Sequence, residues 1–259
     1  MQARTLLGFS YYGAKRFAEA IEYLQPVAGS APENAELHQV LAQSCLWAKK
    51  YDCAQDEFRQ LLEKDPDSAA THVLMGQALD GLGKTPEAIA EFQAAAKVAP
   101  REPNVHFGLG FLYWKAHQYD DAKREFADEL AIDPGNAQAL AYLGDIAMKE
   151  NKPADALPLL RKATQLKNDV RIAYLDLGAI LTQQKKYDEA LIALRRAAKL
   201  EPTAADAHYR MAQVYKAMGN KAESEKEFAK VRDLHQKSDE ALTPKMSSSP
   251  PALTQPETQ

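Results

Sequence analysis

Several features that mark large protein classes are missing from this sequence. No apolar run approaches the roughly 20 residues that a helix needs to cross a bilayer, so we expect no membrane span. The 32 basic residues do not outnumber the 36 acidic ones and form no basic stripe, which argues against a nucleic-acid partner. The first residues show no signal-peptide cleavage site. We therefore expect a soluble protein and favour the cytoplasm as its compartment. The periplasm is the alternative if the given chain has been trimmed.

Cysteine is scarce as well, with Cys45 and Cys53 as the only two. They are eight residues apart, near the end of one expected helix and the start of the next, which would allow a bridge. Two isolated thiols in a helical array are more often free, so we expect free thiols.

Catalytic and cofactor-binding patterns are also absent. No Ser/His/Asp, Cys/His or paired-carboxylate arrangement stands out. Gly83-Lys84-Thr85 resembles the end of a phosphate-binding loop, but Ala78 stands where that loop requires its first glycine, and no strand precedes it. We therefore expect no enzymatic activity and no cofactor.

A repeat of 34 residues dominates what the sequence does contain. Seven blocks follow one another in phase, at residues 1–34, 35–68, 69–102, 103–136, 137–170, 171–204 and 205–238. The eighth position of every block is small, as Gly8, Ala42, Gly76, Gly110, Gly144, Gly178 and Ala212. The twentieth is small too, as Ala20, Ala54, Ala88, Ala122, Ala156, Ala190 and Ser224. This regularity predicts stacked modules in which two helices approach closely at the small residues.

Each block is expected to hold two helices. In block four, His106, Leu109, Gly110 and Tyr113 recur at helical spacing, and a second helix follows a short polar turn. Proline ends five of the second helices, at Pro32, Pro66, Pro100, Pro134 and Pro202. The residues expected to cap the helices that follow are Asn34, Ser68 and Asn136.

Residues 1–238 resemble the tetratricopeptide repeat family. Block four carries the family pattern at Leu109, Gly110, Tyr113, Tyr119, Ala122, Phe126 and Pro134. The resemblance implies an all-α fold, an α-solenoid of stacked helix–turn–helix units that forms a right-handed superhelix with the first helices on its concave side. It also implies binding of peptides or protein segments without catalysis.

Some positions depart from that pattern. Pro26 and Pro158 lie inside second helices, which they should kink. Glu129 stands where the other six blocks have small or apolar residues, so its carboxylate must reach water or a partner. Residues 239–259 are interpreted as the end of the last helix, to about Leu242, followed by a disordered tail rich in Pro, Ser and Thr.

The first block presents an apolar face at Leu6, Phe9 and Tyr12. Two interpretations stand side by side: something packs there, either an upstream segment or a second copy of the chain, or the first repeat is frayed.

Four histidines share the fourth position of their blocks, namely His38, His72, His106 and His208. A zinc ion needs nitrogens at about 2.0–2.1 Å, whereas equivalent positions on packed repeats lie roughly 8–10 Å apart. We expect these rings to fill packing sites, with no metal bound.

The resemblance also places particular positions of each block in the concave groove. The fifth positions hold no lysine, so the carboxylate clamp by which one subgroup grips acidic chaperone tails is absent. The expected peptide-binding residues are instead mostly aromatic or apolar: Phe107, Phe111, Trp114, Trp47, Val73, Gln77, Tyr142, Asp145 and Met148. Phe107, Phe111 and Trp114 form a stripe about 120° from the packing face of their helix. They either bind a partner or pack against neighbouring first helices, and we favour a binding patch.

The sequence thus predicts an adaptor whose groove binds an apolar or aromatic segment of another protein, without naming that protein. The alternative is a structural or self-assembly module that stacks through its N-terminal repeat, or a regulatory arm of a larger protein.

Overall fold

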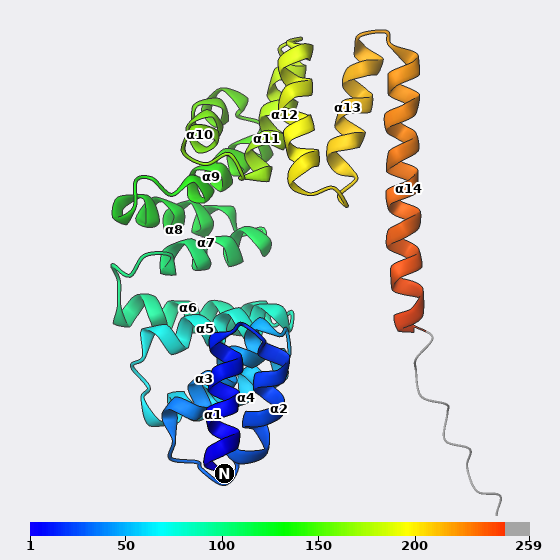
Figure 1. The fold of residues 1–259 in the computed structure, drawn as a ribbon. Coiled ribbons are helices and arrows are strands. Elements are labelled where there is room, and N and C mark those ends of the chain that lie inside the picture. Colours follow the sequence, from blue (N-terminus) through cyan, green and yellow to red (C-terminus); the bar gives the residue numbers. More distant parts are fainter. Residues whose placement is uncertain (247–259) are drawn as a thin grey trace, which may run out of the picture. The chain divides into compact units, whose positions relative to one another are not determined.

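The computed structural model describes residues 1–246, which form α-helices joined by short turns, with no strand in that range (Figure 1). In chain order the helices are α1 Gln2–Gly13, α2 Phe17–Ala28, α3 Ala35–Trp47, α4 Tyr51–Lys64, α5 Ala69–Gly81, α6 Thr85–Val98, α7 Val105–Lys115, α8 Tyr119–Ile132, α9 Ala137–Lys149, α10 Pro153–Leu166, α11 Arg171–Gln183, α12 Tyr187–Leu200, α13 Asp206–Ala217 and α14 Lys221–Met246. The all-α fold expected from the sequence is confirmed.

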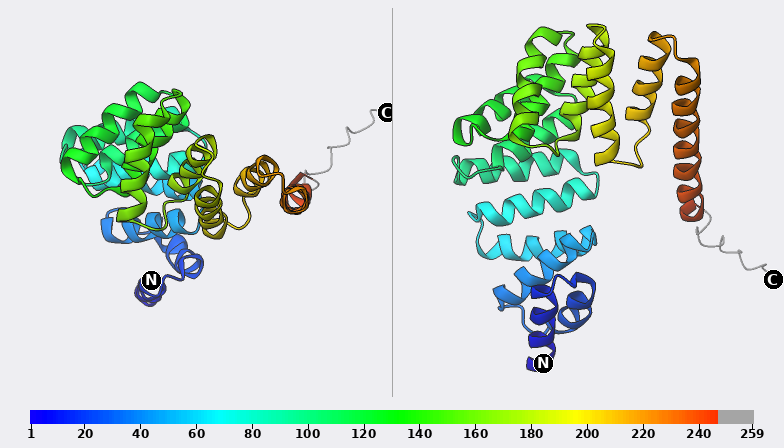
Figure 2. Two further views of the ribbon diagram at one scale, coloured as in Figure 1. Left: turned by 90° about the horizontal axis from the view of Figure 1, so that it is seen from above. Right: turned by 45° about the horizontal axis from the view of Figure 1, so that its top comes forward.

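The chain divides into two compact units, Met1–Ile146 and a second that begins at Ala147. Helices α1–α8 and most of α9 belong to the first unit, and α10–α14 to the second. Within a unit, a first helix packs on its own second helix, and that helix packs on the next first helix, as α5, α6 and α7 do (Figures 1 and 2). This is the stacking of helix–turn–helix modules that the repeat predicts.

The turn inside each module has one recurring backbone conformation. The fifteenth residue of every block has a positive φ, between 58° and 78°, at Lys15, Lys49, Gly83, His117, Asn151, Lys185 and Gly219. The next residue donates its N–H five residues back, as Gln118 does to the Tyr113 carbonyl at 2.9 Å. A left-handed residue after a helix satisfies its last carbonyls in this way and reverses the chain.

Caps at the starts of three first helices follow the sequence prediction. Asn34 Oδ1 accepts from the Leu37 N–H at 3.1 Å, Ser68 Oγ from the Thr71 N–H at 3.4 Å, and Asn136 Oδ1 from the Ala139 N–H at 3.0 Å. Each bond occupies a backbone donor that the first turn of a helix leaves without a partner.

The glycines at the eighth position of their blocks are closely packed. Their nearest neighbour is the side chain of the twenty-fourth residue of the same block. A Cβ added at Gly110 would lie 2.8 Å from the Phe126 ring, and one at Gly178 would lie 2.5 Å from the Leu194 side chain. The second helix thus fits a large side chain against the bare backbone of the first.

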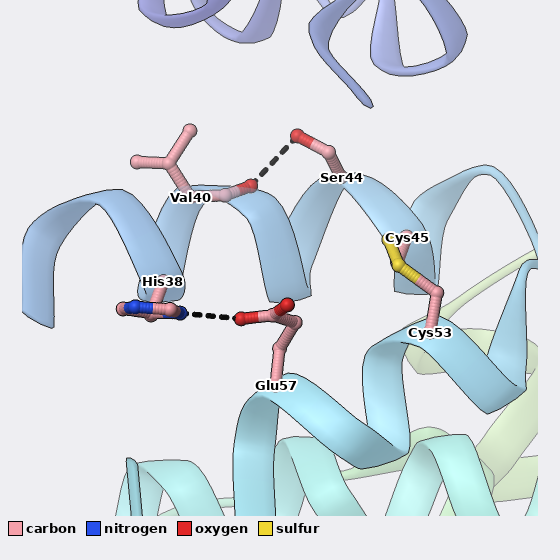
Figure 3. Close-up of a disulfide and its surroundings, with 6 residues drawn as sticks. All are labelled: His38, Val40, Ser44, Cys45, Cys53 and Glu57. Carbon is pink, nitrogen blue, oxygen red and sulfur yellow. Dashed lines mark hydrogen bonds and ion pairs between the residues drawn. A yellow bond between two sulfur atoms is a disulfide. The ribbon is translucent and has the colours of Figure 1, made fainter. Parts of the chain in front are cut away.

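The expectation of free thiols is wrong, because Cys45 and Cys53 form a disulfide (Figure 3). Their Cα atoms are 5.8 Å apart, inside the range that a disulfide spans. Cys45 lies on α3 and Cys53 on α4, and the left-handed turn at Lys49 brings the two helices together. General statistics on free cysteines carried no information about this local approach.

The two prolines that depart from the repeat pattern lie within second helices. Pro26 is inside α2 and Pro158 is inside α10, and neither proline ends its helix. Helix α14 continues past the expected end at Leu242 to Met246, and the rest of the expected disordered tail, residues 247–259, lies outside the described residues. No helix in the described part of the chain is long and apolar enough to cross a membrane.

Candidate functional site

A cavity of about 780 Å³ lies in the first unit between α5 and α7. Its volume falls within the roughly 300–1,000 Å³ typical of ligand pockets. The α5 wall includes Ala69, Ala70, Val73 and Gln77, and the α7 wall includes Phe107, Gly108 and Phe111. Most of these side chains are apolar or very small, so the cavity suits an apolar ligand.

Small residues explain why the space between α5 and α7 stays open. Gly108, the sixth residue of block four, lies against Phe92 of α6, and a Cβ there would come within 2.2 Å of the Phe92 ring. Ala69 and Ala70 on the opposite wall carry only a methyl group. No large side chain from these positions therefore fills the gap.

Polar groups stand at the edges of the cavity. The Asp80 carboxylate accepts a hydrogen bond from Lys115 Nζ at 2.6 Å, which links α5 to α7. Gln77 and Glu102 are exposed parts of the lining. A ligand would therefore meet an apolar floor with an amide and carboxylates around it.

The opposite side of α7 is filled by an aromatic cluster. The Tyr142 ring of α9 contacts Trp114 edge-on at 4.9 Å between centroids, Phe111 at 5.6 Å and Phe107 at 6.0 Å. It also stacks on Phe126 of α8 at 5.6 Å. These distances are those of favourable aromatic pairs, so the cluster braces Phe107 and Phe111 from behind.

Asp145 fixes the polar end of this cluster. Trp114 Nε1 donates to Asp145 Oδ2 at 2.6 Å, and Asp145 is almost fully buried. Burial and then the Asp145 charge raise the pKa of the Tyr142 hydroxyl above its usual value of 10.0, so Tyr142 stays neutral near pH 7.

The structure separates the expected peptide-binding residues into groups. Val73, Gln77, Phe107 and Phe111 line the cavity together. Trp114 and Tyr142 belong to the aromatic cluster and are half-buried, and Asp145 accepts the hydrogen bond from Trp114. The other two lie elsewhere: Trp47 on α3 is 51% exposed, and the half-buried Met148 belongs to the second unit.

Sequence reasoning missed the small residues of the cavity, Ala69, Ala70 and Gly108. Gly108 is the smallest of the sixth residues of the seven blocks. Its signal was available, because the sixth residue of the next block is Tyr142, the largest side chain at that position in the array.

The four fourth-position histidines are joined to glutamates, which the sequence analysis did not foresee. In each block the histidine Nδ1 meets the glutamate nineteen residues later, at 2.5 to 2.8 Å: His38–Glu57, His72–Glu91, His106–Glu125 and His208–Glu227. Figure 3 shows the first of these pairs joining α3 to α4. The pairs tie the two helices of a module together.

His106 has a carboxylate on one ring nitrogen and a backbone carbonyl on the other. Its Nε2 lies 3.1 Å from the Pro100 carbonyl oxygen, while Nδ1 faces Glu125. Burial lowers the pKa of His106, but the hydrogen bonds to Glu125 and Pro100 and the charge of Asp128 outweigh it and raise the pKa above 6.5. His106, Glu125 and Asp128 lie close enough together to hold a metal ion. A protonated His106 ring, however, donates from both nitrogens, to Glu125 and to the Pro100 carbonyl, so these two contacts need no metal.

Glu129 finds its partners inside the protein. Its carboxylate is fully buried on α8 and accepts hydrogen bonds from the Asn104 N–H at 3.1 and 3.0 Å and from the Phe107 N–H at 3.1 Å. Asn136 Nδ2 adds a third donor at 3.0 Å. The expected need for a partner is met by the start of α7 and the residue that caps α9.

Comparisons with known proteins agree with this architecture. Tetratricopeptide repeat models match residues 11–78, 73–137, 178–219 and 206–238, and a model described as anaphase-promoting complex, cyclosome, subunit 3 matches residues 115–197. YpiA, a TPR repeat-containing protein of Bacillus subtilis, is 24% identical over 163 residues, which cover 62% of this chain and 38% of YpiA. This chain thus spans less than two-fifths of the length of that relative.

Two solved structures show the same fold. A tetratricopeptide repeat protein from Parabacteroides merdae matches with a TM-score of 0.71 at 14% identity, covering 90% of this chain and 92% of that one. YrrB, described as a TPR protein with an unusual peptide-binding site, matches with a TM-score of 0.53 at 24% identity, covering 73% and 97%. The tetratricopeptide repeat models, together with the repeated helix pairs, establish that the chain belongs to the tetratricopeptide repeat family.

Proposed function

We propose that this chain is a non-catalytic adaptor whose first unit holds an apolar or aromatic segment of another protein in the α5–α7 cavity. Tetratricopeptide repeat proteins act in protein–protein interaction, which gives the general class of function. The observation that carries the specific proposal is the cavity itself, whose walls include Val73, Phe107 and Phe111.

The cavity walls are held in place before any ligand arrives. Tyr142 and Phe126 contact Phe107, and Tyr142 and Trp114 contact Phe111, so neither phenylalanine needs to be ordered by binding. A binding surface that is already ordered loses less conformational entropy on association. Large apolar side chains in such a setting supply much of the energy of an interface.

The chemistry of the walls indicates a peptide as the ligand. The cavity has room for a few large side chains, and the exposed Gln77 amide offers a donor and an acceptor to a peptide main chain. The solved structure of YrrB, which shares this fold, is described as having a peptide-binding site, and that description supports the same class of ligand.

The proposal is tested by selecting peptides from a random phage-displayed library against the purified chain and measuring their dissociation constants by fluorescence anisotropy. Val73→Glu places a carboxylate on the cavity wall and should weaken a selected peptide by at least about tenfold. Val98→Glu is the matched control, because Val98 is 42% exposed on α6 and does not line the cavity.

Circular dichroism must first show that both variants remain folded. Equal affinity of the two variants for the selected peptide, or a larger loss in Val98→Glu, would contradict the proposal.

A second candidate function, self-association through the N-terminal repeat, is favoured by one observation. Met1, Leu6 and Leu7 on or beside α1 are 69%, 67% and 46% exposed, whereas Phe9 and Tyr12 are half-buried. Sedimentation velocity over a concentration series should show a dimer that Leu6→Glu abolishes. A monomer at every concentration would eliminate this candidate.

The disulfide provides evidence about the cellular compartment in which the protein resides. Disulfides persist in oxidising environments and are rare in the cytosol, so Cys45–Cys53 supports an oxidising compartment over the cytoplasm that the sequence favoured. Acid trapping of the cellular protein, followed by thiol alkylation, should leave both cysteines unmodified. Alkylation of both cysteines would contradict an oxidising compartment.

A further inference from the structure

We infer that Glu129 is a positioning residue for the α5–α7 cavity, because it caps the late start of α7 and so shapes one end of that cavity. This inference rests on the proposed function for its consequence in binding. Its structural part stands on the hydrogen bonds of Glu129 and on where α7 begins.

Helix α7 begins late in its block. Its first residue is Val105, the third of block four, whereas α3, α5, α9 and α11 all begin at the first residue of their blocks. Pro103 and Asn104 therefore lie outside the helix. Asn104 has a φ of 70°, in the left-handed region, and its side chain makes no capping bond.

Glu129 supplies the cap that Asn104 does not. Its carboxylate accepts the N–H groups of Asn104 and Phe107, two donors at the start of α7, from a position on α8. A buried carboxylate at a helix N-terminus also gains from the positive end of the helix dipole. The cap of α7 is therefore provided by the second helix of the same module.

Block four differs from the others at this position. The equivalent residues are small or apolar in the other six blocks, as Val27, Leu61, Ala95, Ala163, Ala197 and Val231. Caps of the usual kind, in which the side chain comes from just before the helix, occur at Asn34, Ser68 and Asn136. The carboxylate of Glu129 and the late start of α7 therefore occur together in one block.

This arrangement matters to the cavity because the unwound residues are part of its wall. Glu102, Pro103, Asn104 and Val105 all line the cavity, as does Phe107, whose N–H is held by Glu129. If α7 began at Pro103, the first residue of its block, Pro103 and Asn104 would belong to its first turn. Glu129 therefore holds the cavity end in its observed shape.

The structural part is tested by amide hydrogen exchange, which needs no ligand. Glu129→Val introduces a residue that blocks one and seven carry at this position, and it should speed exchange of the Asn104 and Phe107 amides by at least about tenfold. Glu129→Gln keeps one acceptor oxygen and nearly the same shape, so it should have a smaller effect. It also keeps the test valid if the valine variant does not fold.

Ser68→Ala is the matched control, because it removes the N-cap of α5, the helix on the other wall. It should speed exchange in the first turn of α5 and leave the Asn104 and Phe107 amides unchanged. Equal acceleration of all these amides in Glu129→Val would show a general loss of stability and overturn the inference. Unchanged exchange at Asn104 and Phe107 would overturn it too.

The binding part uses indole as a probe, followed by ¹H–¹⁵N correlation spectra. Glu129→Val should weaken indole binding at the cavity by at least about fivefold, with Glu129→Gln between it and the parent chain. Faster exchange with unchanged indole affinity would overturn the positioning role. If indole shifts no cavity resonance of the parent chain, the proposed function loses support, while the exchange experiment still decides the structural role of Glu129.

Discussion

The two sides of α7 differ in how they are packed: the side toward α5 is open, and the side toward α9 is filled by aromatic side chains. On the open side, Phe107 and Phe111 face a cavity of about 780 Å³. On the filled side, Tyr142 contacts both of them and stacks on Phe126. Phe107 and Phe111 form the wall between the two regions.

The difference traces to the sixth residue of two successive blocks. Gly108 and Tyr142 both lie against the aromatic twenty-fourth residue of the preceding block, Phe92 and Phe126 respectively. Tyrosine extends from that point and fills the space between two first helices, whereas glycine leaves it empty. At these two junctions, the residue at the sixth position thus distinguishes an open space from a filled one.

Emptying the filled side should have the largest effect on stability. Tyr142→Ala removes a ring that contacts four aromatic side chains and should lower the free energy of unfolding by about 3 kcal/mol. Denaturant titration followed by circular dichroism measures it. A loss below about 1 kcal/mol would mean that the cluster contributes little packing energy.

The disulfide gives a loss of stability that does not involve either side of α7. The chain-entropy relation for a separation of eight residues predicts that Cys53→Ser lowers the free energy of unfolding by roughly 2.5 kcal/mol. The affinity for a selected peptide should stay the same, since neither cysteine lines the cavity. A parallel loss of affinity would show that the cavity depends on the α3–α4 pair.

Filling the open side should separate binding from stability. Gly108→Leu adds a side chain where even a Cβ would lie 2.2 Å from the Phe92 ring, so it should cost roughly 1–3 kcal/mol of stability through overpacking. Peptide binding should be lost under conditions where the variant is still folded. Retained affinity in folded Gly108→Leu protein would place the binding site elsewhere.

The smallest expected effect comes from the histidine–glutamate pair behind the cavity wall. The folded pKa of His106 is raised above 6.5, so its contribution to stability is complete below that pH and is lost as the pH rises through the folded pKa. The difference in melting temperature between the parent chain and His106→Gln should therefore shrink as the pH increases from about 6 to 8. A difference that grows with pH would contradict this assignment.

Local patterns in the sequence were sufficient for much of the fold. Helix pairs, small crossing residues and the caps at Asn34, Ser68 and Asn136 depend on neighbours within a turn or within one block, so a 34-residue repeat reveals them. The sequence predicted where the interhelical turns lie but not their conformation, because lysine or histidine takes the left-handed position in four blocks and glycine in only two.

Contacts across modules were harder to predict. The aromatic stripe of α7 was recognised, but which side of it is open depends on Gly108 and Tyr142 in two different blocks. The partners of Glu129 required knowing that Asn104 leaves the helix, and the disulfide required knowing how closely α3 and α4 approach. Each of these is a matter of three-dimensional distance that spacing along the chain does not encode.

The most direct test of the difference between the two sides of α7 is the position of a bound peptide. Intermolecular nuclear Overhauser effects can be measured between a selected peptide and the isotope-labelled chain. We expect contacts from the peptide to the Val73 methyl groups and to the ring of Phe111, both on the cavity wall. Contacts confined to Leu6 on α1 or Trp47 on α3, with none at Val73, would contradict it.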